Sequence, residues 1–290
     1  MNKILEFQNV SKQYEDTPAL DRLSLSIYEG DFICIVGTSG SGKTTLMKMV
    51  NGLIKPDTGR VLLRGKDIHG EDLISLRRRI GYAIQGNGLF PHMTVAQNIG
   101  YVPRLERRPE AEITRIVEDM LLLVGLPLEM KDRYPDELSG GQQQRVGISR
   151  AYANHPDILL MDEPFGALDP ITRDSLQQLI KRLQKELGKT VVFVTHDMDE
   201  ALALADRIVI MDKGRVVQFD APENILQNPA NAFVESLLGE DRLNEARLAL
   251  RTVDEVMVRD PALVTSEQSI RDALRLMRRH RAETLFVTDP

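Results

Sequence analysis

The chain has 290 residues, of which 42% are hydrophobic and 28% are charged, and its formal net charge at pH 7 is -6. This composition is typical of a globular protein with one large domain or two smaller ones. The acidic balance argues against nucleic acid as a partner, because binding a phosphate backbone needs a concentrated basic surface. The single cysteine, Cys34, has no partner for an internal disulfide, which favours an intracellular protein.

Apolar runs are too short for a membrane-spanning helix, which needs about 20 consecutive apolar residues. The longest runs include residues 33–36 and 121–124. The N-terminus carries Glu6 and has no apolar stretch, unlike a signal peptide. We therefore expect any role at a membrane to be carried out from outside the lipid.

Strand patterns dominate the first third of the chain. Residues 4–10 and 22–27 alternate apolar and polar side chains, as half-buried strands do. Residues 32–36 form a continuous apolar run, which is typical of a strand buried on both faces in a parallel sheet. A glycine-rich stretch follows directly, and residues 46–53 then place apolar side chains at helical spacing.

Helical patterns and a strand–helix alternation follow, up to about residue 238. The pattern predicts helices over 110–124, 141–154, 171–187 and 197–205, strands over 158–161 and 190–194, and a hairpin over 207–219. The alternation indicates an α/β fold with a mainly parallel sheet and a helical insertion between about residues 88 and 154.

The C-terminal end differs in composition. Residues 239–251 predict a charged linker helix, and residues 252–290 show a strand–helix–strand rhythm. Fewer than about 40 residues seldom form an independent core. The main predicted domain is therefore residues 1–238, and the segment after the linker is separate and smaller.

Residues 37–45 match the pattern G-x-x-x-x-G-K-[ST] and lie between a predicted buried strand and a predicted helix. Glycines there let the backbone wrap around phosphate, with N–H groups and the helix N-terminus directed at its oxygens. Lys43 supplies charge to the β- and γ-phosphates, and the Thr44 hydroxyl is placed to bind Mg²⁺. The alternative is a glycine-rich turn that matches by chance. The predicted ATP-binding residues are Gly37, Thr38, Ser39, Gly40, Ser41, Gly42, Lys43, Thr44 and Thr45.

Two carboxylates follow the predicted strand 158–161. Asp162 is a predicted Mg²⁺ ligand, direct or through water, because ligands of open α/β sheets bind at the carboxyl ends of the strands. Glu163 points elsewhere and is placed to polarise an attacking water as a general base. The alternative for this pair is a solvated turn.

A pentapeptide at residues 138–142, Leu-Ser-Gly-Gly-Gln, stands between the two phosphate motifs. A serine and two glycines can open a helix with exposed N–H groups, which is itself an anion site, although a serine-capped helix without such a role is the alternative. Together with the phosphate motifs, this pentapeptide is the signature of ATP-binding cassette (ABC) ATPases. The chain resembles that family over about residues 1–238, which implies a P-loop NTPase cassette with a helical insertion.

The resemblance implies roles for further residues. Tyr14 falls where an aromatic ring usually stacks on adenine, and Asp169 falls in the loop that contacts the partner's phosphate site. Gln85 matches the glutamine that touches Mg²⁺ and the water, and His196 matches the switch histidine that senses the γ-phosphate. In this family two chains pack head to tail, so the γ-phosphate held by one chain is faced by Ser139, Gly140, Gly141 and Gln142 of the other.

Four stretches, residues 79–85, 88–95, 165–173 and 193–201, resemble the ATP-binding subunits of bacterial osmoprotectant importers, which carry glycine betaine, carnitine, choline and similar quaternary amines. The resemblance implies an ATPase that uses Mg²⁺ and drives separate transmembrane permease subunits from the cytoplasmic face of the membrane. A solute-binding protein outside the cell or in the periplasm is the implied indirect partner. An ATPase for another solute, an exporter subunit and an ABC protein of translation or DNA repair stay open as alternatives.

Residues 252–290 resemble the first part of a CBS (cystathionine β-synthase) domain, which such subunits often carry in tandem. The working unit in that family is a pair, and this stretch holds only part of one motif. Sensing of ionic strength or of a nucleotide is one interpretation of the segment, and a tail without function is the other.

Overall fold

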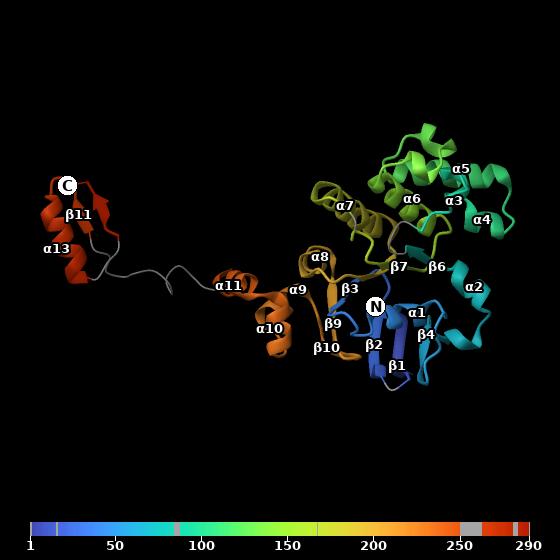
Figure 1. Ribbon diagram of the computed structural model, residues 1–290, viewed down its shortest axis with the longest axis horizontal. Coiled ribbons are helices and arrows are strands. Elements are labelled where there is room, and N and C mark those ends of the chain that lie inside the picture. Colours follow the sequence, from blue (N-terminus) through green and yellow to red (C-terminus); the bar gives the residue numbers. More distant parts are fainter. Residues whose placement is uncertain are drawn as a thin grey trace. The chain divides into compact units, whose positions relative to one another are not determined.

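The computed structural model describes residues 2–15, 17–83, 88–166, 168–249, 263–280 and 284–289 (Figure 1). The chain divides into two compact units, Met1–Glu240 and Asp241–Pro290. None of the described helices combines the length and the apolar character that a bilayer-spanning helix requires.

An antiparallel sheet of strand order β2-β1-β4-β5 forms one part of the larger unit. Its two long strands run further than predicted. Each strand contains a non-glycine residue with left-handed backbone, Asn9 (φ 48°) in β1 and Arg22 (φ 45°) in β2. The register of the β1–β2 pair shifts near both residues, so the strands bulge and the apolar–polar alternation is interrupted there. The strands are β1 (Lys3–Tyr14), β2 (Thr17–Tyr28), β4 (Thr58–Leu63) and β5 (Lys66–Asp67).

The second sheet has the order β10-β9-β3-β8-β7-β6 and is parallel except for β10. Strands β3 and β8 are buried along their whole length, as their apolar runs predict. Because β8 lies between β3 and β7, the carboxyl ends of these three strands meet at one edge of the sheet. The strands are β3 (Phe32–Gly37), β6 (Ile80–Ala83), β7 (Ile158–Asp162), β8 (Thr190–Val194), β9 (Arg207–Asp212) and β10 (Arg215–Asp220).

Helix α1 (Lys43–Val50) joins the two sheets into one hydrophobic core. Its Leu46, Met47 and Met49 are buried in the same cluster as side chains from both sheets. Burial of each such side chain contributes about 1.5–3 kcal/mol, so the loop that precedes α1 is firmly anchored. The other described helices of the larger unit outside the insertion are α2 (Leu73–Arg78), α7 (Pro170–Leu187), α8 (Met198–Leu204), α9 (Pro222–Gln227) and α10 (Ala232–Leu238), with a 3₁₀ turn at Ile68–Gly70.

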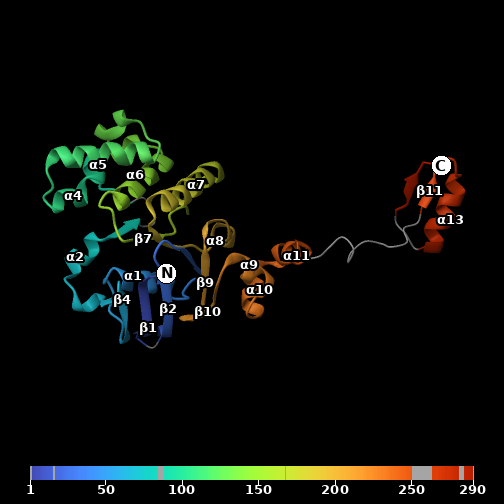
Figure 2. The ribbon, with the colours of Figure 1, turned by 180° about the vertical axis from the view of Figure 1, so that it is seen from behind.

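The helical insertion lies at the end of the larger unit opposite the antiparallel sheet (Figures 1 and 2). Its last helix ends two residues earlier than predicted, because the backbone turns sharply at His155, whose φ is 48°. The predicted mixed α/β fold with a helical insertion is confirmed. The insertion contains α3 (Val95–Ile99), α4 (Tyr101–Leu105), α5 (Glu110–Leu123) and α6 (Gly140–Tyr152), with 3₁₀ turns at Leu128–Asp132 and Pro135–Glu137.

The described residues of the smaller unit form a parallel pair of short strands and the two helices α11 and α13, of which α11 begins at the boundary residue Glu240. The strand–helix–strand order predicted for residues 252–290 is present, whereas the assignment to a CBS domain stays a prediction. Residues 250–262, 281–283 and 290 of the predicted linker and CBS segment lie outside the described residues. The elements are α11 (Glu240–Ala249), β11 (Leu263–Thr265), α13 (Ile270–His280) and β12 (Phe286–Thr288).

Candidate nucleotide-binding site

The predicted phosphate loop joins β3 to α1 at the carboxyl edge of the parallel sheet. Gly42 has φ 100°, and a Cβ there would lie 2.4 Å from the carbonyl oxygen of Ala19 in β2. A Cβ at Gly37 would lie 2.2 Å from the carbonyl oxygen of Met211 in β9. Only glycine fits at both positions, so the course of the loop is fixed by strands of both sheets.

A cleft of about 540 Å³ opens in front of this loop. Its volume lies in the range of small-molecule sites, about 300–1,000 Å³. The cleft brings together residues from three regions that are far apart in the sequence. Its lining residues are Tyr14, Ala19, Ser39, Gly40, Ser41, Gly42, Lys43, Thr44, Thr45, Glu163 and His196.

The ammonium group of Lys43 is held in place by the loop itself. Its Nζ donates to the carbonyl oxygens of Gly37 at 2.7 Å and of Thr38 at 2.8 Å, and the residue is only 7% exposed. Burial lowers the pKa of Lys43, whereas the charges of Glu163 and Asp162 act in the opposite direction. The lysine is thus a preplaced point charge at the mouth of the loop.

The two predicted carboxylates diverge as expected at the end of β7. Glu163 has left-handed backbone, φ 44°, and its N–H donates to the carbonyl oxygen of Val194 at 2.9 Å. Its side chain lines the cleft, whereas Asp162 is not among the lining residues. Burial, and then the charge of Glu163, raises the pKa of Asp162. A strained backbone at a site residue is a typical feature of functional sites.

His196 follows β8 and lies beside Glu163. Its Nδ1 is 3.4 Å from Oε2 of Glu163, and 69% of its side chain is exposed. The two side chains therefore face the same cleft from neighbouring strand ends. This geometry places a carboxylate and an imidazole next to each other beside the phosphate loop.

A buried polar cluster behind His196 was not foreseen from the sequence. The Thr195 hydroxyl donates to Oε2 of Glu200 at 2.6 Å and accepts the N–H of Asp197 at 3.0 Å. Glu200 is 7% exposed, and its burial raises its pKa although the Thr195 bond opposes this. Nε of Arg173, from α7, lies 3.9 Å from the Glu200 carboxylate. The cluster contacts the backbone on both sides of His196. The sequence signal for it was weak, because Glu200 stands in the polar stretch of residues 195–200 and only the fold shows that it is buried.

Thr195→Val should slow ATP hydrolysis about tenfold without weakening ATP binding. Valine has the shape of threonine but loses both hydrogen bonds, and about 1.4 kcal/mol of lost positioning corresponds to a factor of ten. Phosphate release and calorimetric ATP titration measure the two effects. Thr114→Val is the matched control, since that hydroxyl donates to the carbonyl of Glu110 on the exposed insertion. Equal rates for both variants would remove the positioning role of Thr195.

Tyr14 ends β1 at the rim of the cleft, with 45% of its surface exposed. Nζ of Lys12 lies 5.6 Å from the centre of its ring, which is within cation–π range. Lys12 is itself paired with Asp57 at 2.7 Å. The ring is therefore supported at one end of the cleft, with the phosphate loop at the other.

The pentapeptide residues cap the start of α6. Ser139 is the N-cap of α6: its hydroxyl accepts the N–H of Gln142 at 3.4 Å, and the Gln142 side chain accepts the N–H of Ser139 at 2.9 Å. Asp169 is the N-cap of α7 and accepts the N–H of Thr172 at 3.1 Å. Gly141 lies against Thr172, so the starts of the two helices are neighbours. None of the residues Ser139, Gly140, Gly141, Gln142 and Asp169 lines the cleft.

Gln85, predicted to touch Mg²⁺ and the attacking water, lies outside the described residues. The same holds for Ala167, which precedes Asp169 in the predicted dimer loop. The cleft as described therefore contains the phosphate loop, Glu163, His196 and Tyr14, and the N-caps of α6 and α7 are not part of its lining.

Comparison with known proteins gives close relatives. A family profile described as ABC transporter matches residues 20–166. The chain is 53% identical over 287 residues to the carnitine transport ATP-binding protein OpuCA of Listeria monocytogenes, which covers 99% of this chain and 72% of the relative. It is 51% identical over 287 residues to the glycine betaine/carnitine/choline transport ATP-binding protein OpuCA of Bacillus subtilis, which covers 99% of this chain and 76% of that relative.

A solved structure of similar fold is the dimeric post-hydrolysis state of the ATP-binding cassette MJ0796 bound to ADP and Pi. The TM-score is 0.68 at 36% identity, and the match covers 76% of this chain and 99% of the other. The resemblance to the ATP-binding subunits of osmoprotectant importers is confirmed. The chain belongs to the ABC transporter family, as an ATP-binding and ATP-hydrolysing subunit.

Proposed function

We propose that this chain powers the import of a quaternary-amine osmoprotectant through a separate membrane permease. The names of its relatives support the solute class, since one is a carnitine and the other a glycine betaine/carnitine/choline transport protein. The observation that carries the proposal is an identity of 51–53% along 99% of the chain. The chain would work at the cytoplasmic face of the membrane, bound there through the permease.

Each residue of the cleft has a separate role in ATP binding or hydrolysis. The loop N–H groups and Lys43 neutralise the β- and γ-phosphates, and Tyr14 stacks on the adenine. Glu163 accepts a proton from the attacking water, and His196 holds the γ-phosphate beside it. Phosphoryl transfer depends mainly on positioning and charge neutralisation, so loss of one member has a severe effect.

The oxygen donors near the loop fit Mg²⁺. This ion prefers oxygen ligands and takes several from water and substrate phosphates. Thr44 lines the cleft, and Asp162 lies at the end of β7, where a cation would relieve its repulsion with Glu163. The described ranges contain no group of three or more acidic, histidine or cysteine side chains that could hold a metal ion, so water and substrate phosphates would supply the remaining ligands. Thr44, Asp162 and Gln85 would hold the ion, which supplies charge neutralisation on the phosphates when it is bound with ATP.

A head-to-tail dimer completes the site. The residues Ser139–Gln142 do not line the phosphate cleft of their own chain, which leaves them available to the nucleotide of a second copy. In a head-to-tail pair, the helix N-terminus capped by Ser139 would face the γ-phosphate of the second copy. The dimeric state of MJ0796 supports this arrangement.

A groove of about 380 Å³ between the core and the insertion fits a short helix of the permease. Its aromatic lining comes from Tyr82 of β6 and from Phe90 and Tyr101 of the insertion, whose ring centroids lie 4.7 Å apart. Arg150 donates to the carbonyl of Gly88 at 2.8 Å and lies over the Phe90 ring at 5.4 Å, which fixes that segment. An apolar groove with a few fixed polar groups is suited to an amphipathic helix. A solute-binding protein outside the membrane would deliver the solute to the permease.

Reconstitution tests the proposal. The chain and its permease are placed in liposomes so that the chain faces the lumen, and ATP is enclosed in the lumen. These liposomes should take up radiolabelled glycine betaine, carnitine or choline, with spermidine as the cation control. The Glu163→Gln variant should bind the permease but support no uptake. ATP hydrolysis without uptake of any quaternary amine would contradict the solute class, and uptake of spermidine instead would assign another solute.

A further inference from the structure

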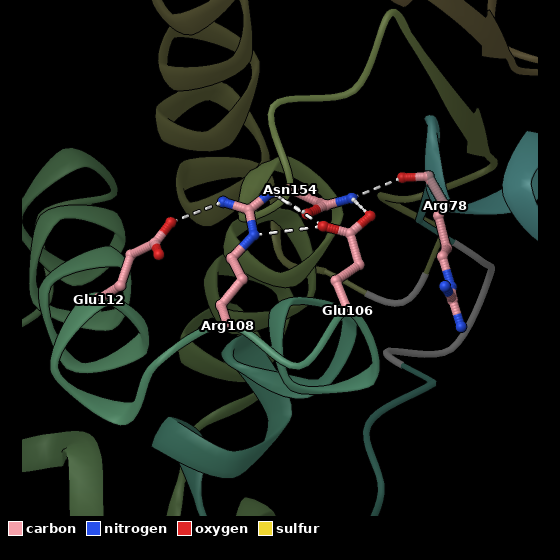
Figure 3. Close-up of polar contacts among 5 residues, drawn as sticks. All are labelled: Arg78, Glu106, Arg108, Glu112 and Asn154. Carbon is pink, nitrogen blue, oxygen red and sulfur yellow. Dashed lines mark hydrogen bonds and ion pairs between the residues drawn. The ribbon is translucent and has the colours of Figure 1, made fainter.

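A polar network joins the helical insertion to the core where the chain leaves α6 (Figure 3). Its centre is the side chain of Asn154, which lies between the α4–α5 turn and the end of α2. The amide nitrogen donates to the carbonyl oxygen of Arg78 at 2.8 Å and to Oε1 of Glu106 at 3.0 Å. The amide oxygen accepts a hydrogen bond from Nη2 of Arg108 at 2.8 Å. One amide thus contacts the core and the insertion at the same time.

The insertion side of this network is itself braced. Arg108 donates to Glu106 at 3.2 Å and 3.0 Å and to Glu112 of α5 at 3.2 Å. Burial acts to raise the pKa of Glu106, but the bonds from Asn154 and Arg108 outweigh it and the pKa is lowered. The carboxylate therefore stays charged, and the Asn154 amide meets a fixed partner rather than a free side chain.

The backbone holds both arms of the network in tight turns. Arg107 and His155 are non-glycine residues in the left-handed region, with φ 59° and 48°. Arg107 lies two residues beyond the end of α4 and His155 three residues beyond the end of α6, and each is next to a side chain of the network, Glu106 and Arg108 in the first turn and Asn154 in the second. On the core side, the N–H of Asp157 donates to the carbonyl of Arg79 at 2.9 Å, next to the Arg78 carbonyl that Asn154 binds.

The contact between α6 and the core is otherwise close and apolar. A Cβ at Gly81 of β6 would lie 2.4 Å from the carbonyl oxygen of Ala151, so the end of α6 lies directly on the strand. Apolar packing is non-directional and tolerates sliding, whereas hydrogen bonds have a preferred direction. The Asn154 amide thus adds a directional contact to this packing.

Two further features connect this joint with function. Arg78 and Asn154 both line the groove between core and insertion, so the network forms one end of that groove. The connection that carries Asn154 leads directly into β7, the strand that ends in Asp162 and Glu163. A change of angle at the joint would alter the width of the groove and the position of the strand together.

We propose that Asn154 is a positioning residue that sets the orientation of the insertion against the core and so couples occupation of the groove to the ATP site. The second half of this inference rests on the proposed function. Asn154 itself touches neither the phosphate cleft nor the reacting atoms.

Two substitutions separate the contacts of Asn154. Asn154→Leu keeps approximately the shape and removes every hydrogen bond of the amide. Asn154→Asp keeps an acceptor for Arg108 but loses the donor to the Arg78 carbonyl, and it places a second carboxylate beside Glu106. Glu110→Gln is the matched control, because it weakens the ion pair with Arg104 at 3.1 Å in the same turn without touching the core.

The first measurement uses the isolated chain and does not depend on the permease. Hydrogen exchange of the backbone around Arg79 and Asp157 should become about fivefold faster in both Asn154 variants, which is the order of one net hydrogen bond. In the Asn154 variants, the strand β8 should exchange at the same rate as in the unchanged chain. In the Glu110→Gln variant, the backbone around Arg79 and Asp157 should also exchange at the unchanged rate. Unchanged exchange in Asn154→Leu, or in Asn154→Asp, would overturn the proposed joint.

The second measurement uses the permease complex in liposomes. ATP affinity and the hydrolysis rate of the isolated Asn154 variants should stay within about twofold, while ATP consumed per solute imported should rise about fivefold. A normal ratio in both variants would overturn the coupling role. If the unchanged chain imports no quaternary amine while the exchange effect is present, the proposed function fails and the joint stands.

Discussion

Glu163→Gln is expected to lower ATP hydrolysis by about 10²–10⁴-fold, the usual contribution of a general base, while ATP binding is kept. Glutamine has the size and backbone preferences of glutamate, so the left-handed residue and its N–H bond to Val194 should be unchanged. The amide cannot accept a proton from water at neutral pH. It can still contact His196, which lies 3.4 Å away in the unchanged chain.

Two measurements separate binding from hydrolysis in this variant. Phosphate release should be near background, and size-exclusion chromatography with ATP should show a larger fraction of dimer, because the closed pair is no longer opened by hydrolysis. Glu186→Gln is the control, as it changes an exposed glutamate of α7 that pairs with Arg182 at 3.9 Å. Near-normal turnover of Glu163→Gln would show that another group activates the water.

Lys43→Ala is expected to weaken ATP binding by about 100-fold or more. Hydrogen bonds to charged groups contribute about 1.5–3 kcal/mol, and in the proposed ATP complex the lysine charge would face two phosphates at once. The substitution also removes the Lys43 hydrogen bonds to the carbonyl oxygens of Gly37 and Thr38, although Thr38 still accepts the N–H of Ser41 at 3.2 Å, so the loop loses part of its order. Hydrolysis should fall in parallel, because the γ-phosphate is no longer held.

Calorimetric titration with ATP and Mg²⁺ measures the affinity of the Lys43→Ala variant. Lys66→Ala, which removes the same charge from exposed strand β5, should bind ATP normally. A melting curve close to that of the unchanged chain shows that the variant is folded. An ATP affinity equal to that of Lys66→Ala would remove the phosphate-binding role of the loop.

The sequence predicted the parts of the site that are local. A buried strand, a glycine-rich loop and a helix follow one another in the phosphate loop, and the chemistry depends on residues within nine positions of each other. The same holds for the apolar strand that ends in Asp162 and Glu163, and for the serine that caps α6. In each case the spacing along the chain already determines where the side chains lie.

Other parts depend on contacts between distant segments, which no local pattern encodes. Gly42 gives the loop its turn, but only the fold shows that Ala19 confines it from β2. The Thr195–Glu200 pair becomes a support for His196 only when Arg173 of α7 packs beside it. Asn154 is one of many polar residues in the sequence, and its role depends on the α2 and α4 ends that meet there.

The fold was predictable to a similar extent. Continuous apolar runs located the buried parallel strands, whereas β1 and β2 were underestimated because bulges at Asn9 and Arg22 break the alternation. The short strand β6 carries only four residues and was not predicted. Its place at the sheet edge is set by pairing with β7 rather than by its own pattern.

Ser139 does not line the phosphate cleft of its own chain, and in the proposed head-to-tail dimer this has a consequence for concentration. In that arrangement a free chain would have to find a second chain in solution to complete either of its sites, so its specific activity should fall on dilution. Two chains held by one permease are instead neighbours at an effective concentration set by the geometry of the complex, commonly in the millimolar range for short tethers. Membrane attachment would thus act as a switch, which keeps stray copies from consuming ATP.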